Sequence, residues 1–378
     1  MENKLVATRI NVLDGFRAIA ILMVLFFLYF SRWTSLYPYG NKYDFFTFGK
    51  MGVHFFFIIS GFVIFYTLEN TKHFLIFWIK RMIRLFPSML VATLITYFFC
   101  NSFDLDFLFP TSHFFKNVLA SVTFLPPDTL ASLFNNRVQL DYISGNYWSL
   151  WPEIQFYLFV SAIYFFNKNK FLSIFISLSI TLVLSNLLIH SGYFENNFIK
   201  VARKFFIVFN LVGSLPYFSF GVLFYSIFKD KTLNQKTPIY LKVYFAGMLL
   251  LQIHSIYSEP IKIGLIFIFL MLFIALIYYP KQIRFLENKI LLKVGISSYF
   301  LYLIHENIGN LIIHKYAGYL YPYEFIFTFI LMILLIVLSI FYSYGIEKKL
   351  NKYLKHIFFN NSYYNQLPEA KIYWQPEK

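Results

Sequence analysis

Residues 13–30 read LDGFRAIAILMVLFFLYF, an apolar run long enough to cross the hydrocarbon core of a membrane as a helix. Asp14 and Arg17 stand three positions apart at its start, and therefore on one face of such a helix. Ionisable side chains within a membrane segment are costly and mark functional sites. This stretch predicts both a membrane helix and a functional site at its inner end.

The composition of the whole chain places this segment in a membrane protein. Hydrophobic residues make up 58% of the 378 residues and charged residues only 13%, whereas soluble domains carry about 25% charged residues. The mean hydropathy is +0.60. Repeated apolar runs of about 20 residues indicate membrane helices, and we predict an all-α polytopic membrane protein. The single cysteine, Cys100, excludes an intramolecular disulfide bond.

We predict about ten transmembrane helices. Their approximate ranges are 13–31, 51–70, 82–100, 147–166, 171–190, 205–228, 241–257, 261–279, 293–313 and 324–345. With the N-terminus inside, most of the 33 Lys and Arg residues fall on cytoplasmic segments, as the positive-inside rule requires. Both termini are then cytoplasmic. The net charge of +15 follows from this topology and from contact with anionic lipid, so nucleic-acid binding is not needed to explain it.

The sequence predicts one membrane domain over residues 1–350, without a second soluble domain. Its one long extramembrane segment is an outer loop over 101–146, and loops of that length are usually functional or disordered. The polar residues 351–378 are expected to form a loose cytoplasmic tail.

Two arginines stand at the cytoplasmic start of the third predicted helix. Arg81 and Arg84 are three positions apart and share a helix face. Paired guanidinium groups suit phosphate binding. Basic residues at this depth are more often simple anchors among lipid headgroups, and the residues alone favour the anchor interpretation.

Two further ionisable residues lie toward the outer ends of predicted helices. Glu153 stands within a membrane-length segment, where a carboxylate suits proton transfer or a hydrogen bond to a hydroxyl. The alternative is a hydrogen bond to a tyrosine of another helix. His54 lies near the outer end of the second predicted helix, where helix capping or an interfacial position explains it as well as chemistry does.

A polar stripe occurs in the ninth predicted helix. Tyr299 and Tyr302 face one way, and His305 lies one turn beyond Tyr302. A chemical path and a satisfied polar contact between helices explain this stripe about equally well. The pair His305-Glu306 lacks the second histidine of a zinc-binding helix, so we predict no metal site.

Five strings, in this order, resemble the acyltransferase-3 family of integral membrane acyltransferases, of the carbohydrate O-acetyltransferase type. They are LDGFR (13–17), GVHFFFIISG (52–61), RMIR (81–84), WSLWPE (148–153) and SYFLYLIH (298–305). The string YGIE at 344–347 resembles the closing element of the family. The resemblance covers residues 13 to about 350, and the ordered set is more specific than any one string.

The resemblance implies an enzyme of the bacterial inner membrane that moves an acyl group, usually acetyl from acetyl-CoA, onto hydroxyls of exported carbohydrates. It implies no bound cofactor, because acyl-CoA is a substrate. Arg81 and Arg84 would hold the CoA phosphates, Asp14 and Arg17 would pair or organise the inner mouth of the site, and Glu153 would position the acceptor or the catalytic base. The expected acceptor path consists of Trp148, Ser149, Tyr299, Tyr302 and His305.

The chain departs from the family at Leu28. The family has a histidine at this position, which is taken to be the base that activates the acceptor hydroxyl, and leucine cannot accept a proton. The chain is then a donor-binding enzyme that has lost its base, an enzyme that uses another base, or a protein without catalytic activity. His54 is the best alternative base, because positions 28 and 54 should lie at similar depth. We favour the first interpretation.

Two non-enzymatic interpretations remain. A transporter or flippase of lipid-linked sugars also places ionisable residues in its helices. Such proteins often have repeated halves and broken helices, and this sequence has no internal repeat. A scaffold for glycan enzymes is the other possibility. Neither should bind CoA, so stabilisation of the folded protein by CoA separates both from an acyltransferase.

Overall fold

A computed structural model of the chain describes residues 10–191 and 197–359. These residues form helices joined by turns, and no strand occurs among them, which confirms the predicted all-α class. Each of the ten predicted segments falls mainly on one helix. These helices are α1 (Asn11–Phe30), α2 (Gly52–Glu69), α3 (Phe74–Phe103), α6 (Leu150–Phe166), α7 (Phe171–His190), α9 (Leu211–Thr232), α10 (Ile239–Ser255), α11 (Pro260–Tyr278), α12 (Lys289–Tyr316) and α13 (Glu324–Tyr342).

Seven helical stretches of the described residues are long and apolar enough to cross a membrane, and the protein is a multi-pass membrane protein. These stretches contain α1, α2, α3, α7, α9, α11 and α13. The other three predicted spans are shorter or more polar. Helices α6 and α10 have 17 residues each, and α12 carries ionisable and amide side chains through its middle. The predicted count of ten spans is therefore not confirmed.

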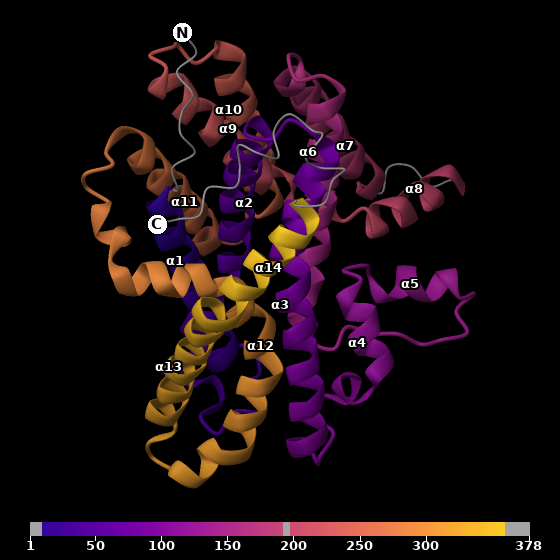
Figure 1. The fold of residues 1–378 in the computed structure, drawn as a ribbon, viewed down its shortest axis with the longest axis vertical. Helices are drawn as coiled ribbons and strands as arrows, with labels where there is room; N and C mark the ends of the chain where they lie inside the picture. The colour runs from indigo at the N-terminus through magenta and orange to yellow at the C-terminus, as the bar shows by residue number, and fades with distance from the viewer. Residues whose placement is uncertain (1–9, 192–196, 360–378) are drawn as a thin grey trace.

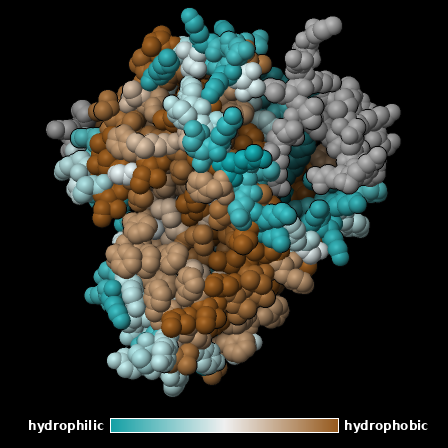
Figure 2. Space-filling model, turned by 90° about the vertical axis from the view of Figure 1, so that its left-hand side faces the viewer, coloured by the Kyte–Doolittle hydropathy of each residue, from teal (hydrophilic) through white to brown (hydrophobic). Residues whose placement is uncertain are grey.

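Four helices form the centre of the bundle, where α2 packs along α9 and α1 packs along α12. In the most apolar part of α9, 83% of the residues are buried, against 17% in α7. Helices α7, α11 and α13 therefore lie on the outside, and α13 exposes large apolar side chains such as Ile330 and Phe341. Figure 2 shows a broad apolar surface bordered by polar regions, as a lipid-facing surface should be.

The predicted outer loop is folded. It contains a 3₁₀ turn (Pro110–His113), α4 (Phe115–Val122), α5 (Pro127–Leu133) and a second 3₁₀ turn (Gly145–Ser149). Figure 1 shows α4 beside α3, with α5 next to α4 on its outer side. Asp104 fixes the start of the loop, because its carboxylate accepts hydrogen bonds from the backbone N–H groups of Leu108 and Phe109, both at 2.8 Å. The loop is thus an ordered part of the molecule that returns to the bundle just before α6.

The prediction of a loose tail does not hold for residues 351–359. They belong to α14 (Lys348–Phe359), which follows α13 through a π-helical turn at Ser343–Glu347 and packs near α3. Basic and apolar residues occupy different faces of α14, as in helices that lie along a membrane surface. The rest of the predicted tail, 360–378, lies outside the described residues.

The sixth predicted helix, 205–228, is divided in the structure. Its first residues belong to α8 (Asn197–Val208), and α9 begins at Leu211. Gln155 of α6 holds the break, because its Nε2 donates to the Val208 carbonyl oxygen at 2.8 Å and its Oε1 accepts from the Leu211 N–H at 2.9 Å. Backbone N–H and C=O groups that lose their helical hydrogen bonds within an apolar region need such partners. The partner lies on another helix, so the apolar run itself gives no sign of the break.

The contact between α2 and α9 brings backbone against backbone. A Cβ added to Gly61 of α2 would overlap the carbonyl oxygen of Phe218, and one added to Gly221 of α9 would overlap that of Ile58. Small residues permit this close approach of membrane helices. The two glycines therefore determine how closely the central helices pack.

Replacing Gly61 with valine should destabilise the protein strongly, because the new side chain has no space unless α2 and α9 separate. Overpacking of a buried site lowers the free energy of unfolding by about 1–3 kcal/mol. We expect a loss of at least the upper value here. Gly247→Val on α10 is the matched control, since no atom lies within 4 Å of a Cβ at that position. Thermal unfolding in detergent measures both variants, and equal melting temperatures would contradict the close contact.

Candidate functional site

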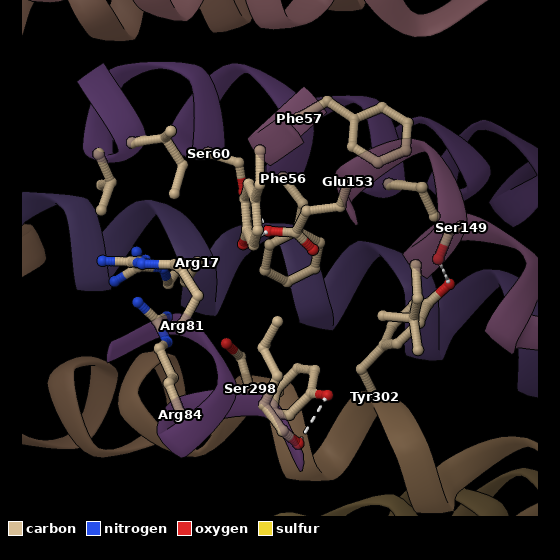
Figure 3. A pocket seen from close by; sticks show the side chains of 17 residues that line it. Arg17, Phe56, Phe57, Ser60, Arg81, Arg84, Ser149, Glu153, Ser298 and Tyr302 are labelled. Carbon is tan, nitrogen blue, oxygen red and sulfur yellow. Dashed lines mark hydrogen bonds between the residues drawn. The ribbon is translucent and has the colours of Figure 1, made fainter. Parts of the chain in front are cut away.

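A cavity lies among α1, α2, α3, α6 and α12, and Figure 3 shows the side chains that line it. Arginines gather at one end, a carboxylate and a serine lie in the middle, and a serine and a tyrosine form the other end. The polar lining residues are Arg17, Ser60, Arg81, Arg84, Ser149, Glu153, Tyr157, Ser298, Tyr299 and Tyr302. Five helices far apart in the sequence thus contribute to one site.

Three arginines form the basic end of this cavity. Arg81 and Arg84 come from one face of α3 and Arg17 comes from α1, and Figure 3 shows their guanidinium groups together on one side. Arg81 donates to Thr67 Oγ1 at 3.1 Å, and its guanidinium lies 5.7 Å from the ring centre of Phe77. These contacts hold a buried cation in place. The cluster suits a ligand with several phosphate groups.

Arg17 is paired with Asp14, which stands three positions earlier on the same face of α1. Its Nη1 donates to Oδ1 of Asp14 at 2.7 Å, and the carboxylate is buried. Asp14 lines a second cavity near the starts of α1 and α12, where Gly295 also contributes. The two cavities share Arg17, Val63 and Arg84. The two cavities therefore adjoin each other between the starts of α1 and α12 and the centre of the bundle.

Glu153 lies in the middle of the cavity, in the first turn of α6. Its Oε1 accepts a hydrogen bond from Ser60 Oγ at 2.9 Å and another from the Tyr157 hydroxyl. Among the described residues no group donates to Oε2. The predicted bond to a tyrosine of another helix is not the one observed, because Tyr157 belongs to α6 itself and the partner from another helix is Ser60 of α2. One carboxylate oxygen of Glu153 is still available to a ligand hydroxyl.

Tyr302 of α12 and Ser149 form the end of the cavity opposite the arginines. Their hydroxyl oxygens lie 2.7 Å apart, and the Tyr302 hydroxyl donates to the carbonyl oxygen of Asn146 at 2.9 Å. Tyr299 donates to the carbonyl oxygen of Leu85 at 3.2 Å. Tyr299 and Tyr302 line the same cavity, which confirms the prediction that they face one way.

Glu306 is a candidate functional residue that the sequence analysis did not assign. Its side chain is 2% exposed and lies 3.5 Å from the Arg32 guanidinium. One carboxylate oxygen accepts hydrogen bonds from Ser144 Oγ at 3.3 Å and from the Asn146 N–H. Glu306 thereby ties the end of the outer loop, which leads to Ser149, to α12. The sequence did contain a feature that could have identified Glu306, because it is a glutamate within a membrane-length segment. The same feature singled out Glu153.

Two predicted acceptor-path residues do not line the cavity. His305 is buried one turn beyond Tyr302, with its Nδ1 against two backbone carbonyl oxygens of the preceding turn. Trp148 is 44% exposed and also lies outside the cavity lining. Of the predicted path, only Ser149, Tyr299 and Tyr302 are cavity residues.

Helices α1 and α12 run side by side in parallel. A Cβ added to Gly295 would overlap the backbone of Asp14, and one added to Gly309 would overlap the ring of Tyr29. Each residue of α1 is therefore level with the residue about 280 positions later in α12.

Leu28 lies beyond the cavity in this register. It is on the same face of α1 as Arg17, about 16 Å further along the helix, and is level with Ile308, whereas the cavity ends at Tyr302. The buried Leu28 side chain lines neither cavity. Its carbonyl oxygen accepts a hydrogen bond from Tyr37, and burial raises the pKa of this tyrosine well above its usual value. The Tyr37 hydroxyl therefore remains a donor.

The expectation that His54 lies level with Leu28 is wrong. A Cβ added to Gly52 would overlap the carbonyl oxygen of Ala20, so the antiparallel α2 places His54 near the level of Ala20, about two turns from Leu28. The reason is that the residues between α1 and α2 fold back along α1 before α2 begins. The His54 ring packs on Tyr217 of α9, with ring centres 4.4 Å apart, and lines neither cavity.

The chemistry of the cavity comes from arginines, hydroxyls and one carboxylate. Within residues 10–191 and 197–359, no group of three or more His, Cys, Asp or Glu side chains is placed to hold a metal ion. The arginines can bind an anionic ligand. The carboxylate and hydroxyls can orient a hydroxyl group. The arrangement therefore suits the transfer of a group between a phosphate-bearing donor and a hydroxyl acceptor.

Comparison with known protein families agrees with this chemistry. The acyltransferase domain of the acyltransferase-3 family matches residues 10–344, nearly the whole chain. The chain therefore belongs to the acyltransferase-3 family of membrane acyltransferases. No curated protein and no solved structure matches it.

Replacing Glu306 with alanine should destabilise the protein, because the Asn146 N–H loses its acceptor and Arg32 loses its carboxylate. A buried donor left unsatisfied costs about 1–3 kcal/mol. Glu306→Gln should cost less, since the amide oxygen still accepts. Thermal unfolding in detergent measures both, with Glu324→Ala at the start of α13 as control. Unchanged melting temperatures for both Glu306 variants would contradict this role.

Proposed function

We propose that the protein transfers an acyl group, most simply acetyl, from acyl-CoA to a hydroxyl of a cell-surface or exported glycan, in the bacterial inner membrane. Membership of the acyltransferase-3 family supports acyl transfer. The observation that carries the proposal is that three arginines share one cavity with a carboxylate and several hydroxyls. CoA has a diphosphate and a ribose phosphate, which are the ligands that clustered guanidinium groups bind.

The two adjoining cavities support a direction for the reaction. Arg17 and Arg84 lie where the two cavities meet. In the proposal, the starts of α1 and α12 face the cytoplasm, and the donor enters there with its phosphates against the arginines. The acyl end then extends along the cavity toward Tyr302. The acceptor approaches from the side of the outer loop, and Oε2 of Glu153 orients its hydroxyl. Holding both reactants in line removes much of the entropic barrier to transfer.

Leu28 reduces the rate in this proposal. A leucine cannot accept the proton of the acceptor hydroxyl, whereas the histidine expected at this position can. The side chain at position 28 lies on the same face of α1 as Arg17, beyond the end of the cavity at Tyr302. The proposed enzyme therefore binds its donor normally and turns over slowly.

Removing the arginines should weaken donor binding. Arg84→Ala and Arg81→Gln each remove a charged donor, and hydrogen bonds to charged groups contribute about 1.5–3 kcal/mol, which corresponds to roughly tenfold to hundredfold in Kd. Titration of purified protein with acetyl-CoA measures the change. Arg137→Ala in the outer loop is the control, because Arg137 is exposed and outside both cavities. Unchanged affinity in both arginine variants would refute the donor site.

Restoring a histidine at position 28 should raise turnover. A positioned general base contributes about 10²–10⁴-fold, so Leu28→His should transfer labelled acetyl from acetyl-CoA to host glycan faster by up to that factor. Leu28→Gln is the control, since glutamine is polar but not a base. A flippase or scaffold would transfer no acetyl in any form and would not be stabilised by CoA. Equal transfer by all three forms would show that position 28 is not the base.

A further inference from the structure

His305 has a free imidazole nitrogen in the interior of the bundle. Its Nδ1 lies 3.1 Å from the carbonyl oxygen of Leu301 and 2.8 Å from that of Tyr302. Carbonyl oxygens only accept hydrogen bonds, so Nδ1 carries the hydrogen and Nε2 of the neutral ring is a bare acceptor. Nε2 is buried and has no hydrogen-bond partner in the described part of the chain. Buried polar atoms without a partner are rare in native proteins.

The imidazole ring is held in a fixed orientation. Its centre lies 5.5 Å from the ring centre of Tyr302 and 6.4 Å from that of Tyr29. The hydroxyl of Tyr29 donates to the His305 carbonyl oxygen at 2.9 Å, and that of Tyr302 is bonded to Ser149 and Asn146. Both tyrosine hydroxyls are therefore engaged elsewhere. An oriented, unpaired imidazole nitrogen is what general-base catalysis requires.

His305 lies between the cavity and position 28. On α12, His305 lies one turn beyond Tyr302, where the cavity ends. Leu28 of α1 is level with Ile308 of α12, so position 28 lies about one further turn along. The hydroxyl pair of Ser149 and Tyr302 separates the ring from the cavity. For the His305 ring to reach a ligand in the cavity, the Tyr302 hydroxyl has to move away from Ser149.

We propose that His305 Nε2 is the general base for the acceptor hydroxyl in this chain and supports its slow turnover, because position 28 carries no base. This rests on the proposed acyl transfer. As the acceptor oxygen forms its bond to the thioester carbonyl carbon, its proton passes to Nε2. The C–S bond then breaks, and the CoA thiolate takes the proton from the imidazolium. The ring returns to its neutral form, and no further reactant is needed.

Other buried ionisable groups are less suited to this role. The carboxylate oxygens of Glu306 are occupied by the outer loop and by Arg32. His54 also has an unpartnered nitrogen among the described residues. Its ring faces Tyr217 of α9, however, and α9 lines neither cavity. His305 combines a free nitrogen with a position at the end of the cavity.

The test compares the unmodified chain, His305→Gln, Leu28→His and the double variant. Transfer of labelled acetyl from acetyl-CoA is measured in membranes with the host envelope glycans as acceptors. Glutamine is similar in size to histidine and keeps an N–H for the backbone carbonyls, but it cannot accept a proton. Thermal stabilisation by CoA reports donor binding separately from turnover. His314→Gln, at the exposed end of the same helix, is the matched control.

We expect His305→Gln to lower transfer about 10²–10⁴-fold, with CoA stabilisation and melting temperature unchanged. Adding Leu28→His should restore transfer, because the second histidine replaces the lost base. Retained transfer in His305→Gln overturns the inference, and so does an unmodified chain that transfers nothing. A double variant as inactive as His305→Gln also overturns it, because His305 then acts in packing. Absence of both transfer and CoA stabilisation in all forms contradicts the proposed function itself.

Discussion

The parallel contact between α1 and α12 is the constraint on which the site depends. Gly295 and Gly309 let the helices meet so closely that any shift in register drives a side chain into a neighbouring backbone or ring. This register places Arg17 level with Ser298. It thereby sets the separation, along the helix axes, between Arg17 at one end of the cavity and Tyr302 at the other. Helices α2, α3 and α6 add their side chains around this fixed pair. The spacing between the basic end and the hydroxyl end of the cavity is therefore determined by backbone contact.

Buried charges determine where the other elements join this pair. An unpaired charge in an apolar interior is expensive, and three carboxylates within the helices have partners, two of them with partners from other elements. Asp14 is bound by Arg17, Glu153 by hydroxyls from two helices, and Glu306 by the return of the outer loop. Acceptor atoms without a donor among the described residues include Oε2 of Glu153 and Nε2 of His305. Unused acceptors at and beside the cavity agree with a site that receives a hydroxyl.

Features that depend on neighbouring residues were predictable from the sequence. Apolar runs gave the helix positions, because the hydrophobic match to a bilayer is a property of each segment alone. The spacing of Asp14 and Arg17 placed them on one helix face, as did that of Arg81 and Arg84, because the helical repeat is local. The break before α9 was not predictable, since the side chain of Gln155 on another helix satisfies its backbone groups.

The sequence by itself determined an all-α membrane protein, its family, and the residues that bring charge into its helices. Only the tertiary structure decided which of them meet. It brought Arg17, Arg81 and Glu153 into one cavity, left His54 facing α9, and placed His305 between the cavity and Leu28. The physical reason is that depth and rotation of one helix against another are set by glycine contacts and buried hydrogen bonds between distant residues, and no local periodicity encodes them.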